Sequence, residues 1–154
     1  MMMRYIALVG LLTGLLSGLA PGAAATDETI GNAKIVNGRV VVLRDGVETP
    51  IKGGDALFRM DVIITGQNGS VGLIFKDNSR LSLGADSRLT FREFRFAPGK
   101  NSLSFISELA HGTLQYISGV IAKLALESVS VITPVATIAV RGTRFLVRIP
   151  KTDG

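Results

Sequence analysis

Residues 131–147 read VITPVATIAVRGTRFLV, the most informative stretch of the chain. It is rich in β-branched residues, which is typical of strands. Pro134 lacks a backbone donor and favours an extended Thr133, so it marks a kink between two strand runs. Gly142, beside Arg141, interrupts the second run and suggests a bulge or a close approach of two backbones. The pattern predicts two closing strands, over residues 129–133 and 135–147.

The chain before this stretch contains a turn signal about every ten residues. Asp45-Gly46 and the cluster Gly66–Gly69 are examples, and short apolar runs lie between such signals. Apolar residues alternate within these runs, and the runs recur about every nine residues: Val62-x-Ile64, Val71-x-Leu73-x-Phe75, Leu81-x-Leu83 and Leu89-x-Phe91. No sustained helical period exists between residues 26 and 118. The sequence therefore predicts an all-β fold, a twisted β-solenoid-like or sandwich arrangement of short strands with little helix.

The N-terminus has the pattern of a secretion signal. Arg4 precedes an apolar run, Tyr5–Ala20, and Ala23-Ala24-Ala25 fits a small-residue cleavage site. A retained membrane anchor is the alternative, but the run is short and glycine-rich for a bilayer span. The expected organisation is a cleaved signal peptide over residues 1–25, a flexible arm over 26–34, a β domain over 35–149 and a tail over 150–154. Within the domain, residues 121–126 form either one helical turn or a loop.

Composition narrows the classes of protein that fit. The chain has 154 residues, no cysteine and a formal net charge of +5. Without cysteine, an exported domain depends on strand packing rather than on disulfides. Residues 88–96 are basic and aromatic-rich, which is a possible nucleic-acid surface. An amphipathic strand with its arginines in solvent is the favoured interpretation, so no nucleic-acid partner is expected. Contact with an acidic surface, such as lipopolysaccharide or an acidic glycan, fits the charge better.

The residues that usually carry catalysis or bind metals are sparse. His111 is the single histidine and lies in an apparent turn, so no metal site is expected. No nucleophile elbow, Walker loop or dinucleotide fingerprint is present. The acids fall at turns, where aspartate usually caps its own backbone, and Asp77 is expected to form an Asx-turn. We therefore expect no enzyme activity, no catalytic residues and no cofactor.

Several short motifs in the same order resemble the FecR domain. The closing motif is Thr-Pro-x-Ala-Thr-x-x-x-Arg-Gly-Thr-x-Phe, and the resemblance extends over residues 35–148. The upstream motifs are Gly54-Asp55, Asp61-x-Ile63-x-Thr65, Phe75-x-Asp77-x-Ser79-x-Leu81-x-Leu83 and Gly119-x-Ile121-Ala122-Lys123. One departure is Asn78, where the family usually has glycine. The resemblance implies an all-β, solenoid-like twist of short strands.

The motif residues are expected to be structural rather than catalytic. They are Gly54, Asp55, Asp61, Thr65, Asp77, Thr133, Pro134, Arg141, Gly142 and Thr143. Arg141 is the polar residue most in need of a partner, and we expect it to be partly buried and paired with Asp55 or Asp61. Contact of Arg141 with a ligand or partner is the alternative.

The resemblance implies a non-enzymatic, exported binding or sensing module. It is similar to the periplasmic part of iron-responsive anti-sigma regulators, without their cytoplasmic and transmembrane parts. The expected location is the periplasm, the cell surface or the medium, with membrane contact only through an uncleaved signal segment. The expected partner is an envelope protein or glycan, bound at a strand edge or groove. The turns carrying Asn68, Asn78 and Asp86 could frame a polar surface. A structural or assembly component of the envelope is the alternative.

Overall fold

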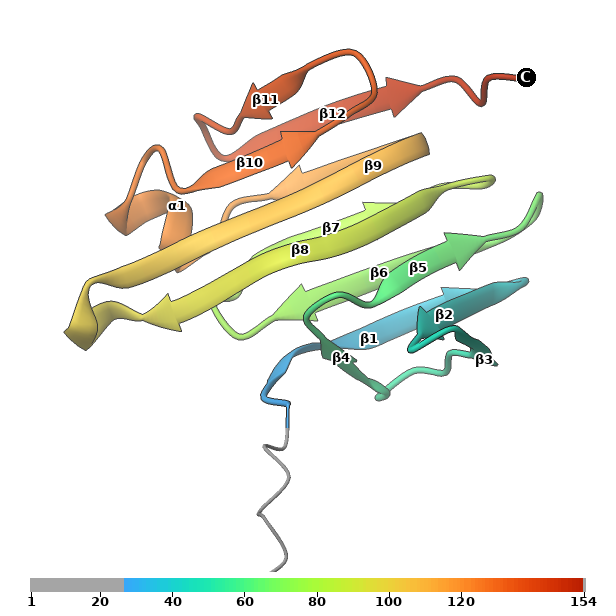
Figure 1. Cartoon of the computed structure of the whole chain (residues 1–154), viewed down its shortest axis with the longest axis horizontal. Helices are drawn as coiled ribbons and strands as arrows, with labels where there is room; N and C mark the ends of the chain where they lie inside the picture. The colour runs from blue at the N-terminus through green and yellow to red at the C-terminus, as the bar shows by residue number, and fades with distance from the viewer. Residues whose placement is uncertain (1–26, 154) are drawn as a thin grey trace, which may run out of the picture.

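A computed structural model describes residues 27–153 of the chain. The predicted signal peptide lies outside these residues. Within residues 27–153, twelve strands and two short helices follow one another (Figure 1). Their bounds are β1 Thr29–Asn37, β2 Val40–Arg44, β3 Val47–Pro50, β4 Ala56–Phe58, β5 Val62–Thr65, β6 Ser70–Phe75, β7 Arg80–Leu83, β8 Arg88–Ala97, η1 Pro98–Lys100, β9 Ser102–Ile117, α1 Val120–Leu124, β10 Val129–Ile132, β11 Thr137–Ala139 and β12 Arg144–Ile149.

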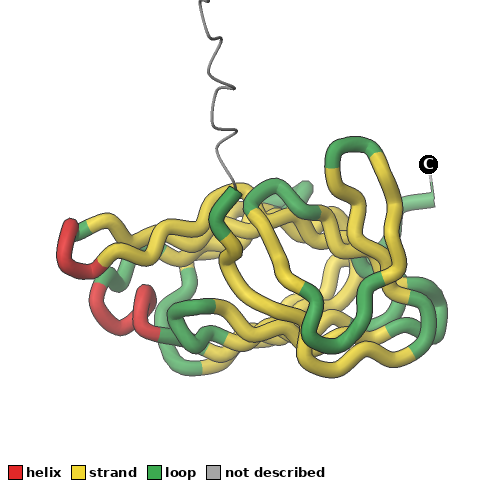
Figure 2. Tube along the Cα trace, turned by 90° about the horizontal axis from the view of Figure 1, so that it is seen from below, coloured by secondary structure: helices red, strands yellow, loops and turns green. Residues whose placement is uncertain are grey.

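The strands form one sheet that curls into two layers (Figure 2). In the front layer of Figure 1 the order is β3-β2-β5-β8, then the first part of β9, then β10 and β11. In the back layer the order is β4-β1-β6-β7, then the last part of β9, then β12. All pairings are antiparallel except that of β10 with β9. This curled half-barrel confirms the predicted all-β class.

The chain passes between the layers at tight corners, and the sharpest is Gly112 in β9. Residues of β9 before Gly112 pair with β8, and those after it pair with β7 and β12. Gly112 has a φ of +103°, and a Cβ there would overlap the backbone of Ser87. Only glycine meets both demands. Side-chain hydroxyls complete this corner: the Ser87 backbone N–H donates to Thr65 Oγ1, and the Thr113 N–H donates to Ser87 Oγ.

A chain of aromatic rings fills the space between the layers. Phe75 of β6 is central, with ring centroids 4.7 Å from Phe105 and 5.2 Å from Phe91. Tyr116 extends the chain and lies 5.5 Å from Phe145 of β12. Edge-to-face and tilted pairs at such distances add to the free energy of burial. The alternating apolar pattern of the sequence is thus the pattern of inward side chains, and the core ties β12 to the centre of the molecule.

Several predicted boundaries were wrong. Residues 29–34, expected in a flexible arm, lie in β1, which pairs with β4 and β6. The expected closing strand over 135–147 is divided into β11 and β12. His111 lies within β9 rather than in a turn. Residues 120–124 form the single helical turn that was one of two options. Strand β8 confirms the amphipathic interpretation, because Leu89, Phe91 and Phe94 are buried while its central arginines are exposed.

Candidate functional site

Asp61, one of the motif acids, is held by Arg44 rather than by Arg141. The Arg44 Nε and Nη2 atoms each lie 2.7 Å from an Asp61 carboxylate oxygen, and the Phe58 N–H also donates to that group. The carboxylate is 1% exposed. The hydrogen bond to Asp61 raises the pKa of Arg44, whose guanidinium also lies 4.5 Å above the Phe58 ring. This bidentate pair fixes the turn between β4 and β5 to β2.

Asp77 anchors the turn between β6 and β7, in the other layer. Its Oδ1 accepts from the Ser79 N–H at 3.1 Å and from the Ser79 hydroxyl at 2.6 Å, so the predicted Asx-turn is present. Its Oδ2 accepts from the N–H of Ile121, which ties helix α1 to the turn. Asn78 has a φ of +65°, which explains how it stands where the family usually has glycine. Asparagine tolerates this left-handed conformation better than most residues.

The remaining turn motifs have local structural roles. The Gly54 N–H donates to the Ala33 carbonyl, and the Asp55 carboxylate accepts from the Lys52 N–H at 2.7 Å. Thr65 Oγ1 donates to the Gly84 carbonyl at 2.6 Å. Thr133 Oγ1 donates to the Ala136 carbonyl and closes the turn that contains Pro134, between β10 and β11.

Arg141 is exposed, and its predicted partner was wrong. Its Nη2 lies 2.9 Å from Glu127, and the two side chains are 72% and 82% exposed. Arg141 follows β11 in the connection that crosses from the front layer to the back layer, so it never enters the core. Gly142 takes a φ of +116° there, and the Ser118 N–H donates to the Thr143 carbonyl at 2.9 Å. The Arg-Gly-Thr motif therefore forms the connection between the two layers, and its hydrogen bond to Ser118 positions the start of β12.

The three turns expected to frame one polar surface lie at two ends of the molecule. The Asp86 N–H donates to the Gly66 carbonyl, which brings the turn of Asp86 to that of Asn68. Asn78 lies at the other end of β6, beside α1. That part of the expectation was wrong. The motif residues likewise lie at separate corners and do not converge on one site.

Within residues 27–153, strand β12 pairs with β9 alone, so its other side is a free edge of the described sheet. The Ser118 N–H bonds to the Thr143 carbonyl, and hydrogen-bonded pairs alternate along an antiparallel ladder. In the register of β12 with β9, Phe145, Val147 and Ile149 therefore bond to β9. The N–H and C=O groups of the intervening residues face away from β9: Arg144, Leu146 and Arg148. The edge thus offers donors and acceptors at every second residue.

The other terminal strands of the described sheet are short or blunted. Strand β3 ends in Pro50, and strands β4 and β11 have three residues each. Proline and short length are the usual means of protecting an edge from pairing. Strand β12 has six residues, with Pro150 only after its end. Among the terminal strands, β12 is therefore the one best suited to take up another strand.

The outer face beside β12 is basic. Arg144 aligns with Ile117 of β9, which aligns with Arg80 of β7. Arg144, Arg148 and Arg80 take part in none of the ion pairs of the described residues. Farther across this face, a shallow groove of about 320 Å³ lies over Gly72, with Lys34 and Arg80 on its rim. Leu146, 68% exposed, lies between the two arginines of β12.

Sequence reasoning missed Arg144, Leu146 and Arg148 as a group. The signal was available in their alternation with Phe145 and Val147, because a period of two separates the two faces of a strand. The sequence alone does not predict which strands lie beside β12. Only the topology identifies this strand as an edge.

The described residues lack the features of a metal site and of a helical membrane span. Within residues 27–153, no cluster of three or more His, Cys, Asp and Glu side chains could hold a metal ion. The same residues contain no helix with the length and apolar character that a membrane span requires.

Comparison with known proteins agrees with the motifs and the fold. The family model described as FecR protein matches residues 61–154, which is more than half of the chain. Neither the curated proteins nor the solved structures gave a match. The match begins at Asp61, so Arg44 and strands β1 to β4 precede it although they belong to the same sheet. The chain belongs to the FecR protein family.

Proposed function

We propose that this protein is a non-enzymatic, exported sensing module that recognises an envelope protein by adding a strand of that protein to the edge of β12. Membership of the FecR family suggests a regulatory sensing module, and FecR domains are typically periplasmic parts of membrane regulators. The export signal predicted at residues 1–25 supports a location outside the cytoplasm. The proposal adds a binding surface to this general role.

The free edge of β12 is the observation that carries the proposal. Strand addition draws its affinity from main-chain hydrogen bonds, and each contributes roughly 1 kcal/mol net. Arg144, Leu146 and Arg148 direct their main-chain groups outward. The edge is also rigid, because Phe145 packs against Tyr116 and the Ser118 N–H holds the residue before β12. Little ordering entropy is therefore lost by this side of the interface on binding.

A proline substitution tests the edge directly. Leu146→Pro removes one outward N–H and leaves the ladder with β9 intact, and Leu146→Ala removes the side chain but keeps the N–H. Tagged full-length variants are used to capture partners from an envelope extract. We expect Leu146→Pro to reduce recovery of a captured protein at least about tenfold, and Leu146→Ala to retain most of it.

A matched control lies on another edge. Ala139 of β11 also directs its N–H away from its neighbour β10, because Val140 donates to Val129 in that ladder. Ala139→Pro should leave capture unchanged. Equal loss with Ala139→Pro and Leu146→Pro, with both variants folded by circular dichroism, would refute recognition at β12.

An acidic envelope glycan is a second candidate partner, which the groove over Gly72 favours. Lys34 and Arg80 lie on its rim, and a Cβ at position 72 would meet only the Ile35 Cβ, at 3.9 Å. Gly72→Val should therefore fill the groove without displacing backbone. If the module binds glycan there, the variant loses retention on a column of acidic envelope polysaccharide. Unchanged retention excludes this groove as the glycan site.

A further inference from the structure

Strand β12 selects its partner by charge as well as by its backbone. We infer that the strand it takes up carries an acidic residue at both ends of a five-residue stretch, with apolar residues between them. This inference rests on the proposed function and specifies the chemistry of the partner. It follows from the sequence Arg144-Phe145-Leu146-Val147-Arg148, whose alternate residues have different surroundings.

The acidic positions follow from the outward row. Each residue of an added strand that lies directly opposite Arg144 or Arg148 has its Cβ about 5 Å from that arginine's Cβ. The two arginines are four residues apart, roughly 13 Å along the strand. Acidic residues at positions i and i+4 of the partner therefore meet both arginines. Leu146 lies midway between them, so the residue at i+2 contacts an exposed aliphatic side chain.

The positions between follow from the inward row. Phe145, Val147 and Ile149 pack against the core but remain half-buried, because no strand covers them on the free side of β12. In an added strand, residues i+1 and i+3 point to the same side as this row. Apolar residues there would complete burial of these side chains, which favours binding by about 25 cal/mol per Å² of apolar surface covered.

The surroundings of the arginines favour an acidic partner. The outward residues of the neighbouring strands carry no carboxylate among the positions that the structure describes: Thr113, Gln115 and Ile117 of β9, Arg80 and Ser82 of β7, and Ser70, Gly72 and Ile74 of β6. Arg80 lies two strands from Arg144, roughly 10 Å away, and adds to the positive potential. Asp86 lines the same surface cleft as Arg148 but forms no ion pair with it.

A second copy of β12 is a poor occupant of this edge. The pattern Arg-x-Leu-x-Arg reads the same in both directions. A second β12 in parallel or antiparallel alignment about Leu146 would therefore place arginine opposite arginine at both ends. Like charges directly opposite each other destabilise a strand pair. The arginines thus oppose self-association and favour an acidic strand, which also argues against edge-to-edge assembly of the protein through β12.

Synthetic peptides test the inference with the full-length protein. The acidic probe is a fluorescent nine-residue peptide with Glu at positions i and i+4, Val at the three positions between them and Thr elsewhere, and the matched probes have Gln or Lys at i and i+4. Fluorescence anisotropy at low salt should show binding to the Glu peptide about fivefold tighter than to the Gln peptide, and weakest binding to the Lys peptide. The double variant Arg144→Glu, Arg148→Glu should reverse this order. Leu146→Pro should abolish binding of all three peptides.

The outcomes separate the inference from the proposed function. Equal affinity for the three peptides, or no binding by any of them, overturns the inference about charge. If capture from envelope extract is nevertheless lost with Leu146→Pro, the strand-addition function stands with a different partner chemistry. If capture is insensitive to Leu146→Pro, the proposed function itself fails. A dimer in sedimentation that Leu146→Pro dissolves would contradict the inference in favour of self-pairing.

Discussion

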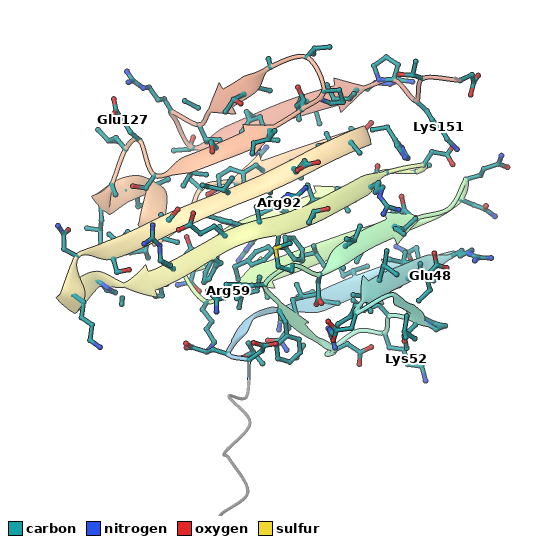
Figure 3. All side chains as sticks on the ribbon, in the orientation of Figure 1. Glu48, Lys52, Arg59, Arg92, Glu127 and Lys151 are labelled. Carbon is teal, nitrogen blue, oxygen red and sulfur yellow. The ribbon has the colours of Figure 1, made fainter. Side chains whose placement is uncertain are left out.

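The two outer faces of the molecule use arginine in different ways. On the front face, Arg92 is 2.6 Å from Glu108 and Arg95 is 2.6 Å from Glu93. Figure 3 labels Arg92 on the strands nearest the viewer. On the back face, Arg144 and Arg148 of β12 form no ion pair among the described residues. The front face is internally neutralised at these positions, whereas the positive charges of Arg144 and Arg148 on the back face are not neutralised by any described carboxylate.

The difference also separates arginines that hold a carboxylate from arginines that form no ion pair among the described residues. An exposed pair contributes about 0.2–1 kcal/mol, and a buried pair holds its partner much more strongly because the acid cannot be solvated. Arg44 belongs to the second kind, since Asp61 is buried. An arginine without a carboxylate partner contributes little to folding. Substitutions of these arginines, and of the glycines at the corners that join the two faces, should therefore change the free energy of unfolding by clearly different amounts.

The largest effect is expected at the corner that joins the faces. Gly112→Ala forces a positive φ on alanine and overlaps the Ser87 backbone, so it should destabilise the fold by about 3 kcal/mol or more. Gly142→Ala is the matched control, because its φ is also positive but nothing lies within 4 Å of the added Cβ. It should cost about 1 kcal/mol. Urea unfolding of both variants measures the difference, and equal losses would show that crowding at Ser87 is unimportant.

The next effect distinguishes buried from exposed ion pairs. Arg44→Met leaves the Asp61 carboxylate buried without its charged partner and should lower the free energy of unfolding by about 3 kcal/mol. Arg141→Met removes an exposed pair and should change it by less than about 0.5 kcal/mol. Urea denaturation at neutral pH compares the two. A loss for Arg141→Met as large as that for Arg44→Met would contradict this distinction between buried and exposed pairs.

Arg44 and Arg141 show which features of the structure the sequence could predict and which it could not. Alternation of apolar residues and the spacing of turn signals predicted the all-β class, because both depend on local geometry. Asp77 was also predicted correctly, since its Asx-turn involves residues two apart. The partner of Asp61 was not, because Arg44 and Arg141 are equally plausible until the strands are placed. Which residue reaches a buried charge depends on tertiary packing.

The candidate site was less predictable than the fold. The N–H groups of Arg144, Leu146 and Arg148 are free because, among the described residues, β12 pairs with β9 on one side and with no strand on the other. The order of strands in the sheet determines which edge is free, and the periodicity of one segment cannot predict that order. The closing motif pointed to Arg141 as the residue of interest, but its side chain forms an exposed ion pair with Glu127. The residues that follow the motif, rather than the motif itself, form the available surface.

A smaller effect concerns Tyr116, in the core that both faces share. Burial, and then the nearby Asp77 carboxylate, raises the pKa of Tyr116, and its hydroxyl has no hydrogen-bond partner among the described residues. Unfolded tyrosine ionises near pH 10, so the unfolded state loses its proton first. Stability contributed by the neutral phenol is complete below about pH 10 and declines above it, by roughly 1 kcal/mol at pH 11.

Tyr116→Phe isolates this contribution. The variant should match the native chain at neutral pH, because the lost hydroxyl makes no hydrogen bond there. Between pH 10 and 11.5 its urea midpoint should fall less steeply than that of the native chain. Parallel curves for the two proteins would mean that the phenol is accessible to water in the folded state.

The smallest effects on stability compare the faces themselves. Arg92→Gln with Arg95→Gln removes two exposed ion pairs on the front face and should cost about 1 kcal/mol at low salt, diminishing as salt screens the pairs. Arg144→Gln with Arg148→Gln on the back face should change stability by less than about 0.5 kcal/mol at any salt concentration, because no ion pair is lost.

For peptide binding, the back-face double variant should have the larger effect and the front-face double variant the smaller. The back-face double variant should lose most of its preference for the acidic peptide, and the front-face double variant should keep it, because Arg92 and Arg95 are already neutralised by Glu108 and Glu93. Peptide titrations and urea curves on the same protein samples test both halves together. If the front-face variant lost binding as well, the long-range positive field of the protein would account for the preference, and the local register of Arg144 and Arg148 would not.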